Sequence, residues 1–207
     1  SDNASPEETV KELGERYELL DTSIKKYPAG QPIQATLEGY FRLVREHRID
    51  GRQIEKIIVR LPDTQARTIN DRHMPDVNCQ YMLAVAMLDG KIDFQNSHDF
   101  ERMHHPQVLA YKKRVEIVAD AELTKIFPAV RSAIVEITTK GGDHFKILLD
   151  RMPGAPYNPL TTAEVEEKFN LLSVPVMGEQ RTNAIVDSAR SLETAVDVAD
   201  LAAQLAL

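Results

Sequence analysis

The feature that constrains this chain most is a proline-rich segment at residues 151–159, which contains Pro153, Gly154, Pro156 and Pro159. Proline lacks a backbone N–H and has a fixed φ, so neither a helix nor a central strand runs easily through such a segment. Upstream of it, helical and strand patterns are mixed, whereas downstream only helical patterns occur. The chain is therefore expected to consist of two structural parts that meet at this boundary.

Strand patterns are confined to the first part. Residues 54–61 alternate, with Ile57, Val59 and Leu61 on one face, and Pro62 ends the run. Further strands are expected at residues 115–118, 132–139 and 144–149, the last two joined by a hairpin at residues 141–143. Strands clustered among helices predict an α+β fold, with an antiparallel sheet and helices on one side of it.

Helices are predicted around these strands from apolar spacing and capping residues. Ser5 and Pro6 predict a helix start, and that helix is expected to reach about residue 20. The other helices of the first part are expected at residues 34–48, 77–88, 97–103 and 106–113. Residues 63–76 are polar and are predicted to form a loop.

The second part is predicted to be helical throughout. Thr161 and Glu164 have the spacing of a capping box, and helices are expected at residues 162–172, 179–191 and 194–206. Val165 and Phe169 lie in an apolar stripe, and helices are stable mainly when such a stripe is buried. No partner for it is evident in the sequence. We therefore predict that these helices return to a missing domain or bind a partner chain.

Composition excludes several classes of protein. A formal net charge of −7 and a pI near 5.4 argue against a nucleic-acid-binding protein. No apolar run approaches the roughly 20 residues that span a bilayer, and the acidic N-terminus is not a signal peptide. The single cysteine, Cys79, fits a reducing cytosol and is interpreted as a core residue. A cytoplasmic protein without membrane or nucleic-acid partners is expected.

Candidate chemistry lies in separate clusters. His98, Asp99 and His105 could suggest a metal hydrolase. On a helix His98 and His105 would share a face, but two ligands rarely suffice and a metal site needs three or more with fixed geometry, so a solvent-exposed helix end is preferred. Lys25 and Lys26 precede a helix and could bind an anion, although adjacent lysines are usually only solvated.

A third cluster consists of polar residues on an otherwise apolar helix. Asn78, Gln80 and Tyr81 need hydrogen-bond partners if they are buried. Those partners could be provided by the protein itself or by a ligand.

The order and spacing of several motifs resemble the MmgE/PrpD superfamily, to which 2-methylcitrate dehydratase, cis-aconitate decarboxylase and iminodisuccinate epimerase belong. The motifs are Ser23-Ile24-Lys25-Lys26-Tyr27-Pro28, Met74-Pro75-Asp76-Val77-Asn78-Cys79-Gln80-Tyr81, Leu88-Asp89-Gly90, His98-Asp99, Pro106-Gln107-Val108-Leu109, and Asn158-Pro159-Leu160-Thr161 followed by Glu164-Val165-Glu166 and Lys168-Phe169. The resemblance extends over about residues 12–205.

The resemblance implies an enzyme without cofactor or metal that acts on a small polycarboxylic acid. A homodimer is expected, because apolar surface meant for the missing domain would be exposed. Such proteins have a large helical domain, an α+β lid and a C-terminal helical return. The implied domains here are residues 1–24 (the end of the helical domain), 25–152 (the lid) and 153–207 (the return). The isolated chain is expected to be inactive, because the proposed acid and base belong to the missing helical domain.

The resemblance also implies roles for individual residues. Lys25, Lys26 and Tyr81 would bind the substrate, and Lys25 and Tyr81 would take part in catalysis. Decarboxylases of the family carry a histidine where this chain has Gly30, which argues against decarboxylation. The alternative is a non-catalytic interaction module that docks a partner chain through its C-terminal helices. Metal analysis would test the weaker metal-hydrolase hypothesis.

Overall fold

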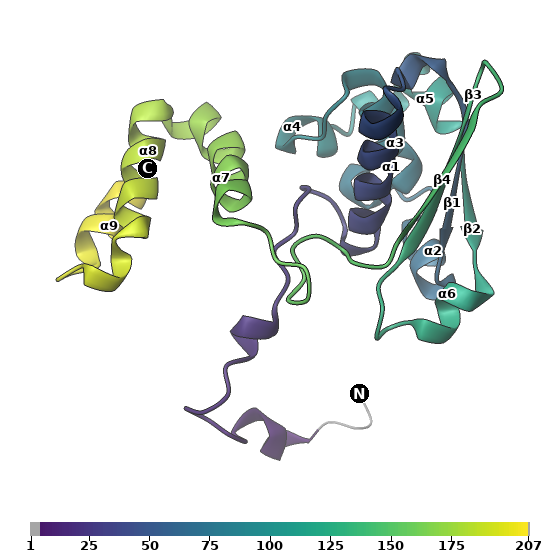
Figure 1. The fold of residues 1–207 in the computed structure, drawn as a ribbon. Helices are drawn as coiled ribbons and strands as arrows, with labels where there is room; N and C mark the ends of the chain where they lie inside the picture. The colour runs from purple at the N-terminus through teal and green to yellow at the C-terminus, as the bar shows by residue number, and fades with distance from the viewer. Residues whose placement is uncertain (1–4, 207) are drawn as a thin grey trace.

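A computed structural model describes residues 5–206 and contains two parts, which we call the sheet body and the helical arm (Figure 1). The sheet body extends from residue 31 to residue 149, and the helical arm from residue 162 to residue 205. The elements of the sheet body are α1 (Gln34–His47), β1 (Ile54–Leu61), α2 (Asp63–Ile69), α3 (Cys79–Asp89), α4 (Phe94–Ser97), α5 (Pro106–Lys112), β2 (Val115–Ala119), α6 (Ala121–Ile126), β3 (Ala133–Thr139) and β4 (His144–Leu149). The arm comprises α7 (Thr162–Met177), α8 (Glu179–Arg190) and α9 (Ala199–Leu205).

The four strands form one sheet in the order β2-β1-β3-β4. β3 pairs antiparallel with both β1 and β4, whereas β1 and β2 are parallel. The predicted α+β fold class is thus confirmed, with one parallel pair at the edge of the sheet. That pair is possible because the long connection from β1 to β2 carries α2 to α5, and a parallel return needs such a crossover.

The core lies between the sheet and the helices α1 and α3. Gly39 of α1 faces the sheet so closely that a Cβ atom there would lie 2.9 Å from the Val135 side chain. α3 is buried on all sides, as expected for a helix that is apolar around its circumference. The other face of the sheet carries ion pairs such as Arg60–Glu136 (2.7 Å) and Lys56–Glu116 (2.8 Å). One face therefore builds the core, and the opposite face is polar.

The predicted helix over residues 5–20 is wrong. The described part of this segment has only short 3-10 turns, Pro6–Thr9 and Glu18–Asp21. Between them the backbone turns at Glu12 and Gly14, which both have positive φ. Val10, Leu13 and Leu19 are 64%, 80% and 79% exposed, so these apolar side chains bury no stripe that could stabilise a helix. Residues 1–4, part of the predicted first domain, lie outside the described residues.

Other differences are smaller. The predicted loop over residues 63–76 is wrong in its first half, because α2 forms there and buries Ala66 and Ile69 against the sheet. The helix expected at residues 97–103 is replaced by α4 and a 3-10 turn at Arg102–His104. Within the tail, α7 continues past residue 172 to Met177, and α9 begins only at Ala199. Further 3-10 turns lie at Gln31–Ile33, Gly51–Gln53, Pro75–Val77 and Leu192–Thr194.

The arm and the N-terminal segment leave the sheet body at one place (Figure 1). The amide of Ile24 donates to the carbonyl oxygen of Gly154 at 2.8 Å, which joins the two chain segments side by side. Gly154 has φ +81°, and a Cβ atom there would overlap the Ile24 carbonyl oxygen. We call this contact the crossing. The predicted domain limits, after residues 24 and 152, lie close to this crossing and stay a prediction.

Candidate functional site

The lysine-containing segment, residues 22–30, forms a strap across the start of α1. Buried Gln34 holds the strap, since its side-chain oxygen accepts from the Tyr27 amide (3.0 Å) and its nitrogen donates to the Tyr27 and Ala29 carbonyls. At its end, the Gly30 amide donates to the Asp76 carbonyl at 2.7 Å. These hydrogen bonds connect the strap to α1 on one side and to the loop before α3 on the other.

Glu38 of α1 is the centre of an ionic network below the strap. Its nearly buried carboxylate accepts from Lys26 Nζ (3.1 Å), from the Tyr27 hydroxyl (2.9 Å) and from Arg42 Nε (2.8 Å). Burial alone would raise the pKa of Glu38, but hydrogen bonds from Arg42 and Lys26 outweigh burial and hold this pKa below its usual value. The network therefore stays ionised and fixes the strap to α1.

Lys26 and Lys25 differ in their surroundings. Lys26 Nζ is bound to Glu38 and also lies 3.8 Å from a carboxylate oxygen of Glu164 on α7. The Lys25 side chain is exposed, and its ammonium has no carboxylate partner in the part of the chain that the structure describes. Of the two lysines predicted to bind substrate, Lys25 is thus the one whose charge is available.

Tyr81 is completely buried in α3. Its hydroxyl donates to the backbone carbonyls of Asn96 (2.6 Å) and Asp99 (3.3 Å). Burial raises the pKa of Tyr81 to about 12, and the charge of Asp99 adds to this effect. No hydrogen bond joins it to Lys25 within residues 5–206, so the structure does not bring these two predicted residues into direct contact.

The polar residues at the start of α3 bind the preceding loop. The Asn78 side chain accepts from the Tyr81 amide (2.8 Å) and donates to the Arg72 carbonyl (2.6 Å). The Gln80 side chain accepts from the Asp71 amide (3.0 Å). Of the two explanations that the sequence left open for these residues, satisfaction by the protein itself accounts for them.

The histidine cluster acts as a set of local caps. The His98 ring stacks on Phe94 with centroids 4.3 Å apart, and His105 accepts from the Gln107 amide at the start of α5. Asp99 accepts from the Arg102 amide at 2.8 Å. Among the described residues, no group of three His, Cys, Asp or Glu side chains could hold a metal ion. Cys79 is fully buried in the core, as predicted.

Two side chains near the strap were not predicted as site residues. Glu38 lies within the helix expected at residues 34–48, and Lys168 of α7 within a motif of the family resemblance. Lys168 Nζ donates to the Lys25 carbonyl at 2.6 Å, although 143 positions separate the two residues. A contact over that separation leaves no local signal in the sequence.

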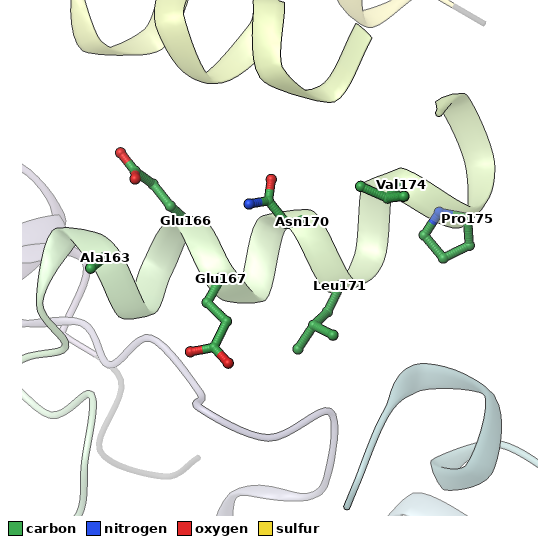
Figure 2. A pocket seen from close by; sticks show the side chains of 7 residues that line it. All are labelled: Ala163, Glu166, Glu167, Asn170, Leu171, Val174 and Pro175. Carbon is green, nitrogen blue, oxygen red and sulfur yellow. The ribbon is translucent and has the colours of Figure 1, made fainter. Parts of the chain in front are cut away.

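A hollow lies along α7, and no residue of the strap lines it. It has a volume of about 520 Å³ and is lined by Ala163, Glu166, Glu167, Asn170, Leu171, Val174 and Pro175. Figure 2 shows that Glu166 and Asn170 point to one side of α7, and Glu167 and Leu171 to the other. All lining residues belong to one helix. A hollow with one wall indicates a surface that lacks its partner and not a finished active site.

Within residues 5–206, none of the helices combines the length and apolar character needed to cross a membrane.

Comparison with known proteins connects this geometry to a family. The family model named MmgE/PrpD C-terminal domain matches residues 27–194, a range that includes Tyr81 and begins just after Lys26. Cis-aconitate decarboxylase of Homo sapiens is 24% identical over 188 residues, which is 86% of this chain and 38% of that protein. The chain thus spans less than half the length of this relative. Since the matched range covers most of the sequence, the chain belongs to the MmgE/PrpD family.

Proposed function

We propose that the chain is the C-terminal, lid-side part of a cofactor-independent lyase or isomerase that acts on small polycarboxylic acids, in the manner of 2-methylcitrate dehydratase. The observation that carries this proposal is the family match over residues 27–194. A helical domain outside this sequence would supply the acid and the base, and the isolated chain would not turn over substrate. A cytosolic homodimer is part of the same proposal.

The chemistry gives Lys25 a role. Removing a proton, water or CO₂ next to a carboxylate builds negative charge in the transition state, and a preorganised cation stabilises that charge without a metal. Lys25 fits because its ammonium is not neutralised by a described carboxylate, while the strap is held by Gln34 and Glu38. Lys26, bound to Glu38, would set the position of the strap and the local potential.

Gly30 supports dehydration over decarboxylation within this proposal. Its φ of −53° is open to any residue, and a Cβ atom would lie 3.4 Å from the Asp76 carbonyl oxygen. The backbone therefore does not require glycine here, and a Cβ atom fits without overlap. We therefore interpret the absence of the decarboxylase histidine at Gly30 as a sign that the reaction is a dehydration.

Replacement of Lys25 by Met tests the proposal in the longer protein that joins this segment to a helical domain. We expect kcat/KM for a citrate-like acid to fall at least about tenfold, because one transition-state charge contact is lost. Lys140→Met is the matched control, since Lys140 is an exposed lysine on the hairpin. Unchanged kinetics in Lys25→Met would refute the role of Lys25.

Tyr81 needs its own test, because its hydroxyl already has backbone acceptors. If it orients substrate or relays a proton as proposed, Tyr81→Phe lowers kcat in the longer protein more than the loss of stability explains. Should Tyr81 be only a core residue, the substitution would cost about 1 kcal/mol of unfolding free energy and leave kcat unchanged.

A second candidate is a non-catalytic module that docks a partner chain through the helical arm. It is favoured by the one-walled hollow on α7, which lacks an opposing surface among the described residues. The sequence upstream in the source genome separates the two: a continuous reading frame encoding a helical domain favours the enzyme, and a start codon just before this segment favours the module.

A further inference from the structure

Lys25 and Lys168 bring two positive charges together at the junction of the strap and the arm. Lys168 Nζ reaches across to the backbone of Lys25, where it donates to the carbonyl oxygen at 2.6 Å. Burial lowers the pKa of Lys168, and the nearby charge of Lys25 lowers it further. The Lys168 ammonium therefore lies against the backbone of Lys25 and senses the positive charge of the Lys25 side chain.

The acidic residues nearby are already engaged. Glu38 binds Lys26, Tyr27 and Arg42. Glu164, one turn before Lys168 on α7, accepts from the amide and hydroxyl of Thr161 at 2.9 Å and lies 3.8 Å from Lys26. Neither Lys25 nor Lys168 has a carboxylate partner among residues 5–206.

Two lysines without a carboxylate partner, one of them hydrogen-bonded to the backbone of the other, give this junction a positive potential that favours a bound anion. We propose that Lys25 and Lys168 form a two-cation subsite for one carboxylate of the substrate, so that α7 contributes a binding residue. This inference rests on the proposed function and extends it to a residue of the arm. Lys168 also donates to the Lys25 carbonyl and would thus fix the position of the strap relative to α7.

The chain itself allows a direct test with tricarballylate, an unreactive tricarboxylate. The signals of Lys25 and Lys168 are followed by NMR in protein labelled with ¹³C-lysine. We expect both to shift with one dissociation constant. Lys168→Met should raise this constant at least about tenfold, which corresponds to roughly 1.4 kcal/mol. Lys168→Arg, which preserves the charge, should bind within about threefold of wild type. Lys140→Met should have no effect.

The outcomes separate the inference from the proposed function. If Lys168→Met binds as tightly as wild type while Lys25 still shifts, the two-cation subsite is wrong and the role of Lys25 stands. Absence of any shift at both lysines also overturns the subsite, and the proposed function is then judged by turnover of Lys25→Met. If inorganic phosphate or propionate binds as tightly as tricarballylate, the junction is a general anion site and its assignment to the substrate is wrong.

Discussion

Glu38 shows how one residue can hold a site without contacting a substrate. Its carboxylate is nearly buried, and its partners are two cations and a phenol. Lys26 and Arg42 are each about one-third exposed, so solvent screens these ion pairs in part. Removal of the Glu38 carboxylate should destabilise the fold more than removal of either cation, because the partly buried cations then lose their counter-ion.

Glu38→Gln should therefore lower the free energy of unfolding by about 2 kcal/mol at pH 7. Urea denaturation followed by circular dichroism measures this change. Glu46→Gln is the matched control, because Glu46 is an exposed carboxylate on the same helix. An equal loss in both variants would mean that the network contributes nothing specific.

The same carboxylate predicts a pH dependence. The pKa of Glu38 in the folded state lies below its ordinary value of 4.5, so its contribution is fully present above pH 4.5 and is lost as the pH falls through the folded-state pKa. The difference in stability between wild type and Glu38→Gln should shrink over that acidic range. A difference that grows on acidification would contradict this assignment.

At the residue scale, sequence indicated which side chains needed partners but not which partners they have. Asn78 and Tyr81 were recognised as polar residues on a buried helix. Their acceptors, the carbonyls of Arg72, Asn96 and Asp99, are set by the path of loops that carry no strong local pattern. Lys168 has a partner 143 positions away and could not be found without the fold.

At the scale of elements, local signals sufficed where packing agreed with them. β1 and β4 have the predicted limits, and the predicted capping box of Thr161 and Glu164 opens α7. At the N-terminus a good cap at Ser5 and Pro6 was not enough. Val10, Leu13 and Leu19 there stay exposed, and a short helix in water is marginal without a buried apolar stripe.

The crossing is an element contact that a single methyl group should break. In Gly154→Ala the new Cβ would overlap the Ile24 carbonyl oxygen, and alanine is also unfavourable at φ +81°. We expect the amide of Ile24 to exchange with solvent at least about tenfold faster, measured by hydrogen–deuterium exchange. Gly178→Ala is the control, because Gly178 has φ +79° with open space around it. If it accelerates exchange at Ile24 equally, the crossing is not a specific contact.

At the scale of the whole molecule, the helical arm carries exposed apolar side chains. Leu171 and Val176 of α7 are 59% and 65% exposed, and Leu192 and Val198 follow on the same arm. Apolar surface of this extent favours association. The chain should therefore self-associate as its concentration rises, and Leu171→Ser with Val176→Ser should reduce this, as measured by sedimentation velocity.

Leu148→Ser is the control for that experiment, because Leu148 is 53% exposed on the polar face of the sheet. Association should persist in it. A chain that sediments as a monomer at every concentration would contradict the prediction. If Leu148→Ser reduced association as much as the double change in α7, the association surface would not be confined to the arm.

The hydrogen bond between Ile24 and Gly154 places the entry and the exit of the sheet body next to each other. A unit whose two ends are adjacent can be spliced into a single loop of a host fold, because the host needs to open at one point only. By the same geometry, the sheet body should be graftable into another fold or exchangeable between relatives as one unit, and a short linker from residue 24 to residue 153 should replace it while the rest of the chain stays continuous.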